Sequence, residues 1–230
     1  MTTAAPAAAC EPPRRRSVAR QSAADDFPAY TLDDEQAAAT AADGLPRVRV
    51  YRPEEVQVVL GRGSRADVEL RRDACRADGV PVTRRPGGGC AVVLDPGNLV
   101  VAATIPQHEL PRIPELFARF SSWLLEGLER VGVTGVHRED ASDLVLGDRK
   151  IGGACLYRPR GVALYATTLL VEPRVERMER YLAHPPREPG YRRGRRHGEF
   201  VGRLADAGGW TTEQLAAALT ETLRPSDLPR

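Results

Sequence analysis

Two apolar segments separated by a four-residue turn restrict the fold most. Residues 90–105 read CAVVLDPGNLVVAATI, in which valine-rich runs flank Asp95-Pro96-Gly97-Asn98. Valine favours strands, whereas Asp, Pro, Gly and Asn favour turns. A connection this short joins antiparallel strands, because parallel strands need a crossover of a dozen or more residues. The segment therefore predicts a β-hairpin and argues against a doubly wound parallel sheet.

Hydrophobic periodicity places helices around such strands. Apolar residues recur at every third or fourth position over residues 111–131, which predicts an amphipathic helix. Further helices are expected at residues 32–42, around residues 175–182, and after Thr211, whose spacing to Gln214 suits a capping box. Strands are expected at residues 46–51, 56–60, 143–146 and 163–171, with a loop around residue 150. The expected fold class is α+β, a mixed β-sheet with flanking helices.

Length and composition fit one folded domain with an extension. The 230 residues are 42% hydrophobic, enough for a sizeable core. Residues 1–28 combine Ala, Pro, Ser and an arginine run, which predicts a disordered extension and leaves 29–230 as the domain. The net charge of +2 does not favour a nucleic-acid partner. With no membrane-spanning or secretion pattern, we expect no membrane partner, a cytoplasmic location and reduced thiols.

Lys150 is the single lysine of the chain, so the 33 Lys and Arg residues include 32 arginines. Genomic base composition would explain the preference for arginine. A lysine that survives such a drift is expected where a guanidinium cannot replace an ammonium, a compact point charge with three donors. We therefore predict a functional role for Lys150.

Three consecutive glycines follow a pair of arginines in the segment RRPGGGC. Glycines can turn their backbone N–H groups towards an anion and let a ligand approach closely. The segment is neither a Walker A motif nor a dinucleotide fingerprint, because no Gly-Lys-Ser/Thr follows and the next element is an expected strand. An ordinary glycine turn is the competing interpretation.

Both segments resemble motifs of one family. RRPGGGCAVVLDPGN resembles the RRxSGGGAVxHDxGN motif of lipoate-protein ligases, and GDRKIGGA at residues 147–154 resembles their GxKISGSA segment. Weaker similarities at VVLGRGS, SDLVLGDRK and TTLLV keep the family's order, over roughly residues 32–224. The resemblance implies a fold of the class II aminoacyl-tRNA synthetase/biotin synthetase type. It also implies a catalytic domain at 29–230, without the C-terminal accessory domain of many bacterial members.

The resemblance implies a two-step reaction. Lipoate and ATP with Mg²⁺ would form lipoyl-adenylate, and the acyl group would pass to a lysine of a lipoyl carrier domain, either H-protein-like or an acyltransferase subunit. An accessory subunit is a further candidate partner. Lys150 would be catalytic, and no metal ligand is assigned. The residues expected to bind substrate or nucleotide are Arg84, Arg85, Gly87, Gly88, Gly89, Asp95, Asn98, Gly153 and Thr168, with bracing of the turn equally expected for Asp95 and Asn98.

Departures from the family pattern keep two alternatives open. Leu94 and the triplet at 165–167 stand where the family has histidines, so no histidine role is inferred, and surface or loop positions are expected for the four histidines. Cys155, and also Cys90, could carry a thioester in an octanoyl or lipoyl transferase, with the thiol pKa lowered beside an ammonium. A non-catalytic lipoyl-binding homologue is the second alternative. The arginine-rich stretch 191–203 resembles the family's late SVRSRV segment, which could approach the nucleotide or the acidic carrier domain, but a solvated basic face is the expected role.

Overall fold

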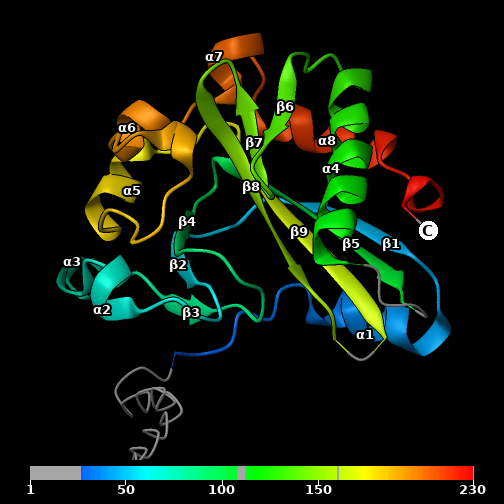
Figure 1. Ribbon diagram of the computed structural model, residues 1–230, viewed down its shortest axis with the longest axis horizontal. Helices are drawn as coiled ribbons and strands as arrows, with labels where there is room; N and C mark the ends of the chain where they lie inside the picture. Colours follow the sequence, from blue (N-terminus) through cyan, green and yellow to red (C-terminus); the bar gives the residue numbers. More distant parts are fainter. Residues whose placement is uncertain (1–26, 108–111, 160, 230) are drawn as a thin grey trace, which may run out of the picture.

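A computed structural model describes residues 27–107, 112–159 and 161–229. Its centre is a six-stranded antiparallel sheet with the order β1-β5-β9-β8-β7-β6, beside a three-stranded sheet with the order β3-β2-β4 (Figure 1). The strands of the large sheet are β1 Arg47–Tyr51, β5 Asn98–Pro106, β6 Val136–Glu139, β7 Asp143–Leu146, β8 Arg149–Tyr157 and β9 Val162–Leu170. Those of the small sheet are β2 Gln57–Leu60, β3 Val82–Arg84 and β4 Val92–Leu94.

Helices cover both faces of the large sheet. The amphipathic segment forms α4, and α8 begins after Thr211, whose capping box with Gln214 is confirmed. These two helices pack on one face, while α1 lies on the other face against β5 and β9. The helices are α1 Asp34–Asp43, α2 Ala66–Glu69, α3 Arg72–Ala77, α4 Ile113–Arg130, α5 Val175–Tyr181, α6 His197–Phe200, α7 Leu204–Gly208 and α8 Thr212–Thr222, with 3-10 turns at Gly190–Arg192 and Pro225–Asp227.

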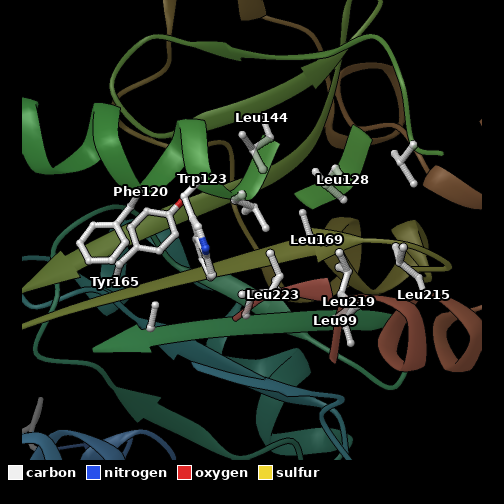
Figure 2. Close-up of a cluster of buried hydrophobic side chains, with 14 of the residues drawn as sticks. Leu99, Phe120, Trp123, Leu128, Leu144, Tyr165, Leu169, Leu215, Leu219 and Leu223 are labelled. Carbon is white, nitrogen blue, oxygen red and sulfur yellow. The ribbon is translucent and has the colours of Figure 1, made fainter. Parts of the chain in front are cut away.

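The main core lies between the large sheet and the pair α4 and α8. Phe120 of α4 stacks on Tyr165 of β9 with ring centroids 4.9 Å apart, and Leu219 of α8 packs into the same cluster (Figure 2). Burial of each such large side chain contributes about 1.5–3 kcal/mol. The core therefore fixes one face of the large sheet and leaves the opposite face for other contacts.

The two strands around the turn at 95–98 exist, but the predicted hairpin between them is wrong. β4 pairs with β2 in the small sheet, whereas β5 pairs with β1 and β9 in the large sheet. The turn carries the chain from one sheet to the other. The expected α+β class is confirmed: the large sheet is antiparallel, and the small sheet is mixed, because β2 pairs parallel with β3 and antiparallel with β4. The extension expected at 1–28 lies outside the described residues except for its last two.

Candidate functional site

A cavity of about 610 Å³ lies on the face of the large sheet opposite the main core. Side chains of β5, β8 and β9 form one wall, and the small sheet with the glycine segment 87–89 forms another. Residues from the range 178–201, which includes the C-terminal half of α5 and all of α6, complete the lining. Lys150, Gly153, Cys155 and Thr168 line this cavity together. Residues from both motifs identified in the sequence are therefore brought to one site.

Lys150 lies in β8 and not in a loop, and a β-bulge gives it its direction. Gly152 pairs with Leu144, but Lys150 pairs with the next residue, Val145, so Ile151 is an extra residue in β8. Side chains alternate along a strand, and the extra residue shifts that alternation. Ile151 consequently packs in the main core, while Lys150 lines the cavity. Without the bulge, Lys150 would face the core.

Lys150 is held by Asp143, which is in turn held by Tyr191, and the sequence did not single out either residue. Its Nζ donates a hydrogen bond of 2.7 Å to Oδ1 of Asp143, and the hydroxyl of Tyr191 donates one of 2.8 Å to Oδ2 of the same carboxylate. Gly153 lies opposite Asp143 in the sheet, and a Cβ there would be 3.1 Å from Lys150 Nζ. Pairing of the strand at 143–146 with the residues after Gly147 could have indicated Asp143 from the sequence, whereas no pattern indicated Tyr191.

The glycine segment interlocks with residues 61–64. Arg62 N donates to Gly87 O at 2.9 Å, and a Cβ on Gly61 would lie 2.0 Å from Gly89 O. Arg84 Nη1 donates to the carbonyls of Gly61 and Ser64 at 2.8 and 2.9 Å. The similarity seen at VVLGRGS therefore marks the physical support of the glycine segment.

Arg85 and Glu69 hold the other side of the glycine segment. Arg85 Nη2 donates to the carbonyls of Gly88 and Cys90, each at 2.8 Å, and its Nη1 donates to Val59 O. The buried Glu69 accepts from the backbone N–H of Ala91 at 2.7 Å. Arg85 lines the cavity, whereas Arg84 and Gly88 do not. Binding of substrate oxygens by these arginines stays a prediction.

Asp95 and Asn98 brace the turn between the sheets. Asp95 N donates to Asn98 Oδ1 at 2.8 Å, and the carboxylate of Asp95 accepts from Arg174 N and Arg177 Nη1, both at 3.1 Å. Both residues are buried and lie outside the cavity lining. Of the two roles expected for them, bracing is observed, and contact with a nucleotide stays a prediction.

The two thiols at the cavity do not have the expected acidity. Burial raises the pKa of Cys155, although the guanidinium of Arg85 lowers it in part. Burial also raises the pKa of Cys90. The expectation of a lowered thiol pKa is therefore wrong, because loss of hydration outweighs the neighbouring cations. Either thiol would need a general base before it could act as a nucleophile.

Arg192 is a further cation at the cavity, and its burial corrects the prediction of a solvated basic face at this position. It is 4% exposed, its Nε donates to Arg195 O, and its guanidinium lies over the Phe200 ring. Its Nη2 is buried and has no hydrogen-bond partner in the described part of the chain. Glu188 Oε2 lies 3.6 Å from Nε of this guanidinium and compensates part of its charge, whereas the donor Nη2 is suited to an anionic ligand.

His197 is also buried at the cavity, contrary to the expected surface position. Burial lowers its pKa from 6.5 to about 4, and Arg192 contributes to the decrease.

In the parts of the chain that are described, no three His, Cys, Asp or Glu residues form a metal cluster. No described helix is long and apolar enough to cross a membrane.

The low pKa of His197 predicts acid sensitivity. Below about pH 6.5 the unfolded chain binds a proton on this side chain, whereas the folded protein does so only near pH 4. Stability should therefore fall as the pH decreases through this window. A His197→Gln variant should show a smaller decrease in Tm between about pH 7 and pH 5 than the wild type. An equally steep decrease in that variant would contradict the assignment; the exposed His184, replaced by glutamine, is the control.

Known proteins of similar sequence are lipoate-protein ligases by name. An Aeropyrum pernix protein, whose name assigns it provisionally to lipoate-protein ligase A, is 34% identical over 134 residues, 54% of this chain and 50% of its own length. The lipoate–protein ligase of Streptococcus pyogenes is 29% identical over 126 residues, 55% of this chain and 36% of its own length. The chain thus spans about a third to a half of these relatives.

Solved structures show the same fold at low identity. A bipartite lipoate protein ligase of Thermoplasma acidophilum, described with its E2 lipoyl domain, has a TM-score of 0.68 at 21% identity, covering 80% of this chain and 73% of its own. A lipoate-protein ligase A bound with ATP has a TM-score of 0.65 at 22% identity, covering 81% and 76%. The sequence of residues 26–224 matches the family model of the lipoyl protein ligase A/B catalytic domain. With its fold and both motifs in agreement, the chain belongs to the lipoyl protein ligase A/B catalytic domain family.

Proposed function

We propose that the chain activates lipoate with ATP and transfers the lipoyl group to a lysine of a lipoyl carrier domain. The observation that carries this proposal is the pair of cations at one cavity. Lys150 and Arg192 both line the cavity. Lys150 Nζ is hydrogen-bonded to Asp143, and Arg192 Nη2 is buried without a hydrogen-bond partner among the described residues. Two anions, a carboxylate and a triphosphate, must meet in such a reaction, so the site needs cationic and backbone donors.

The first step would form a mixed anhydride. A carboxylate oxygen of lipoate attacks the α-phosphorus of ATP, the bond to the β-phosphate oxygen breaks, and pyrophosphate leaves. The Lys150 ammonium is suited to the carbonyl and α-phosphate oxygens of the adenylate. Glycine N–H groups of residues 87–89 are suited to the charge that accumulates on the phosphate. In the second step the carrier amine attacks the acyl carbonyl, loses a proton, and AMP leaves.

Asp140 and Asp143 line the cavity and would be carboxylates available to a Mg²⁺ that arrives with the nucleotide. Magnesium is usually held by one or two carboxylates together with substrate phosphates and water, so a preformed cluster of three protein ligands is not required. Bound Mg²⁺ would neutralise phosphate charge. The neighbours solved with ATP and described with an E2 lipoyl domain support ATP as co-substrate and a lipoyl domain as partner. An accessory subunit and a cytoplasmic location belong to the same proposal.

Intact mass spectrometry tests the proposal. The full chain is incubated with lipoate, ATP, Mg²⁺ and an apo lipoyl domain, and the domain should gain one lipoyl group. Omission of ATP, or removal of Mg²⁺ with a chelator, should prevent the gain. Transfer from a lipoyl or octanoyl carrier in the absence of ATP, with none from free lipoate, would instead establish a transferase.

Cys155 supplies the specific test of the transferase alternative, since it lines the cavity five residues after Lys150. A Cys155→Ser variant should retain most of the ATP-dependent ligation, because the proposed route has no thioester and the raised thiol pKa disfavours a thiolate. Ligation rates of wild type, Cys155→Ser and Cys155→Ala are compared at saturating ATP. Loss of ligation in both folded variants would favour a thioester.

A further inference from the structure

Both carboxylate oxygens of Asp143 accept a hydrogen bond from another segment of the chain. Oδ1 accepts from Lys150 Nζ at 2.7 Å, and Oδ2 accepts from the Tyr191 hydroxyl at 2.8 Å. Asp143 is 7% exposed, so its carboxylate depends largely on protein donors in place of water. A donor on each oxygen restricts rotation of the carboxylate and gives the ammonium a fixed acceptor. Each oxygen keeps a further lone pair, so the two hydrogen bonds are compatible with Mg²⁺ at the same carboxylate.

Further contacts fix Tyr191 itself. Its ring packs against Phe200 with ring centroids 5.1 Å apart. Its carbonyl accepts from Arg195 Nη2 at 3.0 Å, and Nη1 of the same guanidinium is paired with Asp148 at 2.9 Å. Asp148 lies in the turn between β7 and β8. The tyrosine is therefore attached to the same two strands that carry the carboxylate and the ammonium.

Packing alone does not require the hydroxyl of Tyr191. A phenylalanine at this position would keep the ring contact with Phe200, whereas a tyrosine also supplies a donor to Asp143. Tyr191 does not line the cavity, although Asp143 and Lys150 do. The hydroxyl therefore reaches a bound substrate only through the carboxylate and the ammonium.

We propose that Tyr191 is a positioning residue for acyl-adenylate formation. Its hydroxyl orients the Asp143 carboxylate, which in turn holds the Lys150 ammonium where the carbonyl and α-phosphate oxygens of the adenylate meet. This inference rests on the proposed function, because it takes Lys150 to contact those oxygens. Misplacement of a reacting group by about 1 Å can cost about a hundredfold in rate, so loss of the hydroxyl should slow acyl-adenylate formation by about tenfold to a hundredfold.

NMR of the single lysine tests the positioning without reference to activity. The full chain is prepared with lysine labelled with ¹³C at Cε, and because Lys150 is the one lysine of the chain, one lysine signal is expected. An ordered side chain relaxes faster than a mobile one. Tyr191→Phe should therefore slow the transverse relaxation of this signal and move its shift towards that of free lysine. Tyr181→Phe is the matched control, because it removes a hydrogen bond of 2.9 Å to another carboxylate, that of Asp78, away from the cavity.

Single-turnover trapping of the acyl-adenylate provides the kinetic test. The amplitude gives the fraction of active protein and the rate constant describes the step itself, so loss of folded protein is separated from loss of positioning. Tyr191→Phe should lower the rate constant but keep the half-saturating concentrations of ATP and lipoate, because the ammonium acts on charge that develops in the transition state. In an Asp143→Asn background the same substitution should have a much smaller effect, since the hydroxyl acts through that carboxylate. Tyr181→Phe should keep the wild-type rate constant.

The outcomes separate this inference from the proposed function. If the wild type forms no acyl-adenylate, the proposed function fails, and the NMR comparison alone decides whether Tyr191 holds Lys150. If the wild type is active, an unchanged lysine signal or an unchanged rate constant in Tyr191→Phe overturns the inference and leaves the proposed function intact. Equal slowing by Tyr191→Phe in the wild-type and Asp143→Asn backgrounds also overturns it, because the hydroxyl would then not act through the carboxylate.

Discussion

A Lys150→Arg variant should lose acyl-adenylate formation by a factor of about 10²–10³ or more while keeping its fold. The Lys150 ammonium lies 2.7 Å from Asp143 Oδ1. It also lies close to Gly153, where a Cβ would come within 3.1 Å of Nζ. The planar guanidinium is larger and directs its donors differently, so it cannot place a point charge at the same position. This is the physical reason for a lysine in a chain of arginines.

Pyrophosphate release and trapping of the acyl-adenylate measure the effect, with Tm and circular dichroism as checks of folding. Arg149→Lys is the matched control, because it exchanges the same two residue types one position away at an exposed site. The control should keep the wild-type rate. Turnover near the wild-type level in Lys150→Arg would refute the assignment of Lys150, and equal losses in both variants would point to a defect of β8 in general.

The second large effect is expected at Gly61. A Cβ there would lie 2.0 Å from the carbonyl oxygen of Gly89, far inside van der Waals contact, and backbone cannot rotate away as a side chain can. Gly61→Ala should therefore lower the free energy of unfolding by about 1–3 kcal/mol or more. At about 2–4 °C per kcal/mol for a chain of this size, Tm decreases by several degrees. Since the displaced carbonyl belongs to the glycine segment, ligation should decrease as well.

Gly63→Ala is the matched control, two residues away in the same segment, because a Cβ at Gly63 meets nothing within 4 Å. Its Tm and activity should stay close to those of the wild type. Chemical and thermal unfolding of the two variants provide the comparison. An unchanged Tm in Gly61→Ala would mean that residues 61–64 and 87–89 do not support each other in solution.

Local patterns predicted most of the elements and the two motifs, but not how the strands pair. The amphipathic stripe gave α4, and the capping box gave the start of α8, because both depend on residues close in sequence. The turn at 95–98 was identified from its residues. Whether its flanking strands pair with each other depends on β2, β1 and β9, which are distant in sequence, so the hairpin was predicted wrongly.

The residues of the candidate site were likewise predictable only where the signal is local in the sequence. Lys150 could be singled out from composition and the glycine segment from its residues. Asp143, which holds Lys150, and Tyr191, which holds Asp143, come from two other segments, and only the sheet register and the packing of residues 190–192 bring the three side chains together. Likewise, nothing in the sequence indicates that Arg192 is buried while Arg193 and Arg196 are exposed. Residue type predicted the candidates, and three-dimensional proximity supplied their partners.

Because β8 contains an extra residue, the number of residues in this strand, and not only their type, determines where the Lys150 side chain lies. Ile151 interrupts the alternation of β8, so Lys150 and Gly153 share the cavity face although they are three positions apart. A regular strand over the same residues would place Lys150 on the core face, whereas loss of one residue between Lys150 and Gly153 would remove the bulge and keep the ammonium on the cavity face. The bulge and the number of residues between Lys150 and Gly153 therefore decide together on which side of the sheet this charge lies.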